Sequence, residues 1–189
     1  MKNLKSIALA LVVALGTLTA TAQTSKKVDV AKSKINWTGK KFTGQHEGTI
    51  NLKEGNLVFN GKKLVGGNFV VDMNTINTTD LKAGEGKEKL DGHLKADDFF
   101  GVANNPTSAL VFKTIGAKSN NTYTVTADLT IKGITNPITF DVVVNKNVAV
   151  AKLAVDRTKY DIKYASVGFG AVADKAISDN FDLVVNLKF

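Results

Sequence analysis

Apolar and polar residues alternate along several stretches of the chain. From 123 to 132 the odd positions are apolar and the even positions are polar. The same rule holds, with few exceptions, over 181–189 and 69–74, and over 138–145 the even positions are the apolar ones. A period of two is typical of a β-strand with one buried face and one wet face. Weaker alternation predicts further strands near 34–43, 46–53, 56–60, 108–115 and 148–156.

Turn-forming residues separate these stretches and indicate antiparallel hairpins. The candidate turns are Glu54-Gly55-Asn56, Asn60-Gly61-Lys62, Asn120-Asn121, Asn136-Pro137 and Asn145-Lys146-Asn147. About eight strands of this kind predict an all-β fold, either a sandwich or a closed barrel. Closure removes exposed strand edges, and at about eight strands the interior holds side chains or one small ligand.

Two stretches depart from the alternation. Between 80 and 105 the apolar residues are spaced more like one face of a helix, with glycines interrupting, so we expect one or two short helices crossing an end or a side of the sheet. Residues 164–178 are irregular as well.

The first 22 residues resemble an export signal. Lys2 and Lys5 precede an apolar run from 6 to 18, and Ala20-Thr21-Ala22 forms a small-residue cleavage site. The run is too short for a membrane span, which needs about 20 apolar residues. We therefore expect cleavage near Ala22, a single domain over 23–189, and a location outside the cytoplasm, either periplasmic or secreted.

Composition argues against several functional classes. Without Lys2 and Lys5 the remaining 167 residues carry 23 basic and 17 acidic side chains, a net charge of +6. This favours solubility or attraction to anionic surfaces. Nucleic-acid binding is disfavoured because Arg157 is the only arginine and no basic cluster with interleaved aromatics occurs. The two histidines lie far apart and cysteine is absent, so we expect no metal, no cofactor and no cysteine nucleophile.

One polar cluster has two interpretations. Asp91, His93, Asp97 and Asp98 fall together in the irregular stretch. A carboxylate beside a histidine could perform acid–base catalysis. Because no nucleophile or metal ligand set accompanies the cluster, we favour helix capping and a polar network that holds the loop.

Four motifs, in order, resemble the YceI-like family. They are Leu90-Asp91-Gly92-His93-Leu94-Lys95-Ala96-Asp97-Asp98-Phe99-Phe100, then Asn105-Pro106-Thr107 with Leu110-Val111-Phe112-Lys113, then Asp128-Leu129-Thr130-Ile131-Lys132-Gly133-Ile134-Thr135, and Asp156-Arg157-Thr158-Lys159-Tyr160-Asp161-Ile162. The resemblance implies an eight-stranded antiparallel lipocalin-like barrel that holds a long isoprenoid or other extended lipid, without catalysis.

On this resemblance, the inward apolar residues become candidates for the lining of a lipid-filled lumen. They are Trp37, Phe69, Val71, Met73, Leu94, Phe99, Phe112, Leu129, Ile131, Phe140, Val142, Phe181 and Leu183. Trp37 could instead plug an end. Asp91, His93 and Arg157 are candidates for polar contacts with a headgroup or within a lid formed by 80–105.

The expected partners are a long-chain lipid and, transiently, a membrane surface. Two alternatives stay open at this point: a structural or stress-related β protein whose core is filled, and an enzyme that acts on a bound lipid through Asp91, His93 and Arg157. The oligomeric state does not follow from the sequence.

Overall fold

The computed structural model describes residues 22–189, so the expected signal segment lies outside the described residues except for Ala22. The described elements are β1 (Gln23–Lys27), η1 (Val30–Lys32), β2 (Lys34–Lys41), β3 (Gly44–Asn60), β4 (Lys63–Thr78), α1 (Lys87–Lys95), β5 (Thr107–Ser119), β6 (Thr122–Ile131), β7 (Ile134–Asn145), β8 (Val148–Asp156), η2 (Arg157–Tyr160), η3 (Val167–Phe169), η4 (Ala173–Lys175) and β9 (Ile177–Lys188).

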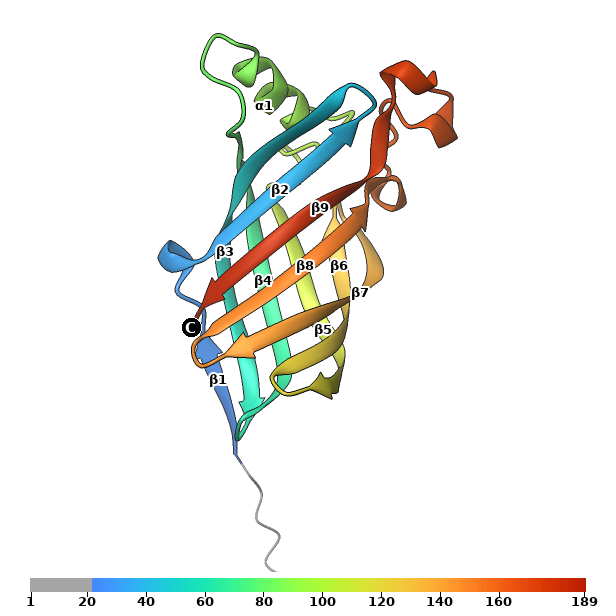
Figure 1. Ribbon diagram of the computed structural model, residues 1–189. Helices are drawn as coiled ribbons and strands as arrows, with labels where there is room; N and C mark the ends of the chain where they lie inside the picture. The colour runs from blue at the N-terminus through green and yellow to red at the C-terminus, as the bar shows by residue number, and fades with distance from the viewer. Residues whose placement is uncertain (1–21) are drawn as a thin grey trace, which may run out of the picture.

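Strands β2 to β9 close into an eight-stranded antiparallel barrel (Figure 1). The hydrogen-bonded order runs β3-β2-β9-β8-β7-β6-β5-β4, and β4 pairs with β3 to complete the circle. The long strand β3 pairs with β2 through its first half and with β1 through Asn56–Asn60. The alternation left a sandwich or a barrel open, and the eight-stranded barrel that the family resemblance implies is confirmed.

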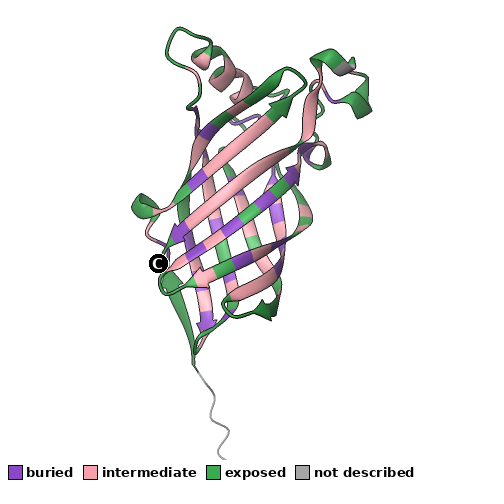
Figure 2. Ribbon diagram, in the orientation of Figure 1, coloured by how far each residue is buried: buried purple, intermediate pink, exposed green. Residues whose placement is uncertain are grey.

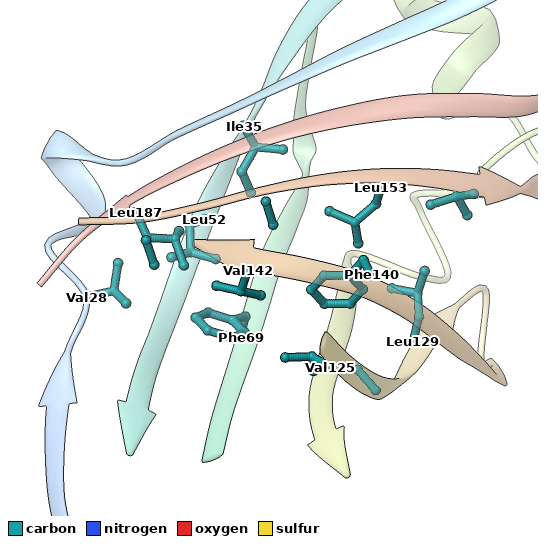
Figure 3. Close-up of a cluster of buried hydrophobic side chains, with 14 of the residues drawn as sticks. Val28, Ile35, Leu52, Phe69, Val125, Leu129, Phe140, Val142, Leu153 and Leu187 are labelled. Atoms are coloured by element: carbon teal, nitrogen blue, oxygen red, sulfur yellow. The ribbon is translucent and has the colours of Figure 1, made fainter. Parts of the chain in front are cut away.

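The alternation of residue types is also an alternation of burial. Along β6 the buried residues are Val125, Ala127, Leu129 and Ile131, and their neighbours in sequence are more exposed. Figure 2 shows buried positions alternating with exposed ones along the barrel strands. Figure 3 shows side chains from several strands, among them Phe69, Phe140 and Leu153, converging on the space that the barrel encloses. The inner face of the sheet is thus the hydrophobic core.

Two predicted turns are wrong, and each has a local physical reason. Strand β3 continues through Gly55, whose missing side chain makes room for Phe69: a Cβ atom there would lie 2.6 Å from the Phe69 ring. A register shift between Leu52 and Glu54 accompanies this close approach. Strand β7 continues through Pro137, because β8 pairs with β7 only across Val142–Asn145 and leaves that edge of β7 free at Pro137.

The other three predicted turns are confirmed. Asn60 pairs with Lys63, Ser119 with Thr122, and Asn145 with Val148, so each connection has two residues. The left-handed conformation that such turns require falls on Gly61, Asn121 and Lys146, with φ of 59°, 62° and 53°.

The two irregular stretches lie at the same end of the barrel, which we call the helix end (Figure 1). Of the expected one or two helices in 80–105, the structure has one, α1, followed by turns that carry Phe99 and Phe100. Residues 164–178 contain the short turns η3 and η4. The opposite end is filled by the buried side chains of Val28, Leu57, Phe59 and Leu64. No helix within 22–189 is long and apolar enough to cross a membrane.

A glycine in β3 provides a test of how tightly the wall is packed. A Cβ atom on Gly48 would overlap the Trp37 indole ring and the backbone oxygen of Asn77, whereas a Cβ on Gly39 meets nothing within 4 Å. We expect Gly48→Ala to lower the free energy of unfolding by about 1–3 kcal/mol or more, because overpacking forces neighbours out of place. Gly39→Ala, on the paired strand β2, is the matched control and should cost far less. Urea unfolding of both variants checks this, and equal stabilities would contradict the packing seen here.

Candidate ligand-binding cavity

The barrel encloses an apolar cavity. Its volume is about 190 Å³. One water needs only about 10–15 Å³ on this scale, so the space exceeds a packing defect many times over. Every strand of the closed barrel contributes to the wall, and the turns after α1 contribute Phe99 and Phe100. A largely apolar cavity with few polar groups is the usual form of a small-molecule site.

All thirteen lining candidates from the sequence lie on this wall. Trp37 lines this wall, and its indole N–H donates to the backbone oxygen of Thr49 at 3.2 Å. Phe112 forms an aromatic bridge across the wall, with its ring centroid 5.5 Å from Phe69 and 6.1 Å from Phe140. Whether these side chains contact a ligand stays a prediction.

Other parts of the wall are not among the residues predicted from the sequence. They include Ile35, Ile50, Leu52, Leu57, Ile76, Phe100, Leu110, Ala149, Ala151, Leu153, Val185 and Leu187. The signal was present for β8, where Ala149, Ala151 and Leu153 alternate with outward residues, but small alanines do not stand out as lining residues. They matter because small inward side chains leave the interior open.

Polar residues on the wall are few, namely Ser108, Arg157, Ser178 and Asn180. The Ser108 hydroxyl donates to the backbone oxygen of Thr130 at 2.8 Å. The Arg157 guanidinium lies at the helix end and is only 1% exposed. The lumen therefore offers little to a polar ligand and much to an apolar one.

Arg157 holds together the segment that leaves the barrel after β8. Its side chain donates to four backbone oxygens, those of Ile162 and Tyr164 at 2.8 Å and those of Ile177 and Ser178 at 3.0 Å. The guanidinium carbon also lies 5.8 Å from the centre of the Phe99 ring. A guanidinium has five N–H groups, so at most one remains for any other partner.

Electrostatics support this structural role. Burial lowers the pKa of the Arg157 guanidinium, and the nearby carboxylates of Asp179 and Asp156 act in the opposite direction. The Asp179 carboxylate lies 3.6 Å from the guanidinium. The charge is thus compensated within the fold, and the expected headgroup contact at Arg157 gains no support from the geometry.

Asp91 anchors α1 to the end of β4. Its carboxylate accepts from the backbone N–H of Thr78 at 2.7 Å and from the Lys87 ammonium at 2.9 Å. Lys87 also donates to Asn77 and to the backbone oxygen of Thr78, at 2.6 Å each. Burial raises the pKa of the Asp91 carboxyl, but the hydrogen bonds from Thr78 and Lys87 outweigh it and leave the pKa below its ordinary value.

His93 packs among aromatic rings. Its ring centroid lies 4.4 Å from that of Tyr164 and 5.6 Å from that of Phe99, both edge-on. Its Nε2 atom is 3.9 Å from an Asp98 oxygen and has no hydrogen-bond partner among the described residues. Asp91 and His93 are not part of the cavity wall, so the structure does not assemble Asp91, His93 and Arg157 around the lumen.

The capping interpretation of the acidic cluster is wrong, whereas the network interpretation holds for Asp91. The N-cap of α1 is Gly86, with φ of 98° and no side-chain cap. Asp97 and Asp98 are exposed beyond the C-terminus of the helix. Within the described range, no three His, Asp or Glu side chains gather as a metal site would require.

A model of the YceI-like domain matches residues 27–189. The chain belongs to this family. The solved structure of BcnA from Burkholderia cenocepacia superposes on this YceI-like barrel with a TM-score of 0.64 at 20% identity, covering 85% of this chain and 98% of that one. A YceI protein of Campylobacter jejuni gives a TM-score of 0.56 at 14% identity, covering 100% and 98%. At these identities the likeness shows the fold alone.

Sequence relatives match over shorter stretches. A UPF0312 protein of Shewanella denitrificans is 33% identical over 92 residues, which is 49% of this chain and 46% of that protein. A UPF0312 protein of Staphylococcus aureus is 47% identical over 58 residues, 31% of each chain. This YceI-like chain thus aligns with about half, or less, of the length of the curated relatives it matches.

The Asp91 anchor predicts a pH dependence. Because the pKa of Asp91 is lower in the folded than in the unfolded protein, its carboxylate stabilises the fold fully above the ordinary value near 3.8, and this contribution is lost as the pH falls through the folded value. Asp91→Asn should therefore lower stability by about 1 kcal/mol near neutral pH, with a difference from the wild type that shrinks toward zero in acid. Hydrogen exchange of α1 amides across this pH range measures it. Asp97→Asn, an exposed neighbour, is the control and should leave exchange unchanged.

Replacing Arg157 tests whether its four hydrogen bonds hold together the segment after β8, a role that we call the Arg157 clamp. Arg157→Lys keeps the charge but has three N–H donors on a single nitrogen, so at least one of the four backbone oxygens loses its donor. An unpaired buried polar group costs about 1–3 kcal/mol, so urea unfolding should show a loss of that size or more. Faster hydrogen exchange over 161–178 should accompany it, and unchanged exchange there would argue against the clamp.

Proposed function

We propose that this protein binds one extended apolar lipid of the isoprenoid type in its lumen, to store or carry it outside the cytoplasm, without catalysing a reaction. The observation that carries the proposal is the apolar cavity bounded by every strand of the closed barrel. A filled-core β protein, the first alternative, would have no such space.

The energetics fit a carrier. Burying about 12 methylene groups at about 0.8 kcal/mol each yields about 10 kcal/mol gross. Association costs of about 4–15 kcal/mol offset much of this, so only a ligand with a longer chain gains enough to remain bound through purification. The wall favours chain length over headgroup, because its polar residues are few and the side chains of Ser108 and Arg157 already bond to the backbone.

The positions of the polar candidates argue for binding over catalysis. Asp91 is engaged by Thr78 and Lys87, and His93 lies among rings outside the cavity wall. Acid–base chemistry on a lumen ligand would need such groups within hydrogen-bond reach of it. The role of an exported lipid binder also accords with the expected signal segment and with the family resemblance.

Mass spectrometry is the direct test. The protein is purified from its own host, weighed in its native state and then extracted with organic solvent. A long-chain lipid at one molecule per chain is the expected result, and its headgroup would identify the class. An apo mass that stays unchanged after incubation with isoprenoid lipids would rule the proposal out.

A pair of alanines on β8 sharpens the test. Ala151 is buried on the cavity wall, whereas Ala154, three residues later, faces outward and is exposed. Ala151→Phe places a ring in the lumen and should reduce bound lipid about tenfold or more, since each methylene displaced forfeits about 0.8 kcal/mol. Ala154→Phe adds the same ring outside and should bind as the wild type does. Equal lipid content in the two variants would contradict binding in the lumen, provided that urea unfolding shows both folded.

A further inference from the structure

The helix end carries four large apolar side chains that face solvent. Phe42, at the β2–β3 turn, is 78% exposed, and Val167, Phe169 and Val172, between β8 and β9, are 59%, 56% and 61% exposed. On the barrel wall the exposed valines reach only 38–44%. A cluster of apolar residues that a fold leaves in water usually marks an interaction surface. We call these four residues the apolar tips.

The two loops that bear the apolar tips are neighbours. The backbone N–H of Phe42 donates to the oxygen of Ala176 at 3.4 Å. A shallow groove runs between the loops and is lined by Phe42, Val167 and the segment 176–179, together with Lys40 and Lys41. Ile177 and Ser178 line both this groove and the barrel cavity. Two of the apolar tips, Phe42 and Val167, therefore border a point where the interior of the barrel adjoins the surface.

The loop that carries three of the tips is held in place from beneath. Arg157 bonds the backbone oxygens of Ile162, Tyr164, Ile177 and Ser178, on either side of the loop. The backbone N–H of Ala171 donates to the oxygen of Ser166, whose side chain is buried. These contacts hold the backbone of a loop whose apolar side chains are exposed to solvent.

Lysines surround the apolar tips. Lys40 and Lys41 precede Phe42, the Lys163 ammonium lies 5.1 Å from the centre of the Phe169 ring, and Lys175 follows Val172. Asp182 pairs with Lys40 and Asp161 with Lys163, each at 2.6 Å and exposed to solvent. Charge thus contributes modestly, and the apolar side chains dominate any attraction.

We propose that the apolar tips insert into the surface of a phospholipid bilayer, with the surrounding lysines against the phosphates and the helix end facing the membrane. Separate apolar knobs framed by lysine suit the interface between headgroups and acyl chains, where long amphipathic side chains reach the charged layer. This docking goes beyond the proposed lipid binding and does not depend on what the cavity holds.

Vesicle flotation tests the proposal. The chain from Gln23 onward, which contains all the described strands, is mixed with vesicles of phosphatidylcholine alone or with added phosphatidylglycerol. The wild type should float with both, more strongly with the anionic vesicles. Phe42→Ser combined with Phe169→Ser should weaken binding about tenfold or more, because two aromatic side chains lose their burial.

A matched pair of valine variants provides the control. Val167→Ser with Val172→Ser removes two tips, and Val65→Ser with Val111→Ser makes the same change on the outer barrel wall. Only the first pair should weaken flotation. Equal loss in both pairs, or no flotation of the wild type, would overturn the proposal. A third result would also overturn it: the wild type sediments as a dimer and does not bind vesicles, and the variant with Phe42→Ser and Phe169→Ser sediments as a monomer. The surface would then join two copies of the chain.

Ala151→Phe separates docking from the lumen. This variant should float as the wild type does even where it no longer retains lipid. Lost lipid with intact flotation would support docking that is independent of the bound lipid, whereas flotation that disappears with the lipid would overturn docking through the apolar tips.

Discussion

The structure depends on closure of an antiparallel sheet whose inner face is apolar. In a closed barrel each strand has two paired neighbours, although β8 pairs with β7 only across Val142–Asn145, and every second residue points to the same interior. The hydrophobic core and the cavity wall are consequently the same surface: Phe69, Leu129 and Phe140 are core residues by burial and wall residues by position. A polar side chain there would be desolvated without a partner, and the side chains of Ser108 and Arg157 both bond to backbone oxygens. The same constraint that makes the barrel stable makes its interior suited to an apolar occupant.

At the helix end the chain between β8 and β9 leaves the barrel sheet, and the side chain of Arg157 supplies hydrogen bonds that the sheet does not. The chain leaves the sheet after Asp156 and returns at Ile177, and this excursion and its borders carry backbone oxygens that need hydrogen-bond donors. Arg157 supplies donors to four of them from a nearly fully buried position. A hydrophobic side chain could fill the volume but would leave these oxygens unpaired, at a cost of about 1–3 kcal/mol each. The only arginine in the chain thus works as part of the backbone architecture, and its charge is offset by neighbouring aspartates.

The fold was accessible from sequence because its determinants are local and periodic. Alternation in β6 and β9 identified wall residues without any knowledge of the third dimension, and Asn60-Gly61-Lys62 identified a hairpin by the backbone conformation it requires. Where the prediction failed, the decisive contact was remote. Gly55 is small because of the Phe69 ring on β4, and Pro137 is tolerated because β8 diverges from β7 there. The partners of Asp91 and Arg157, and the unfilled volume behind Ala149 and Ala151, likewise depend on how distant strands meet, which no pattern along the chain encodes.

The two ends of the barrel differ in a way that bears on how an apolar ligand would enter and leave. The end with Leu57 and Phe59 is packed, whereas the helix end is bordered by a helix tied to β4 through polar contacts of Asp91 and Lys87 and by a loop with apolar tips. Moving a lipid chain from the lumen into water exposes its methylenes at about 0.8 kcal/mol each, but moving it into the acyl layer of a bilayer exposes almost none. On the proposed function, exchange is therefore fastest where the lumen adjoins a membrane. Ile177 and Ser178, shared by the cavity wall and the groove between the apolar tips, lie where such a route would be shortest.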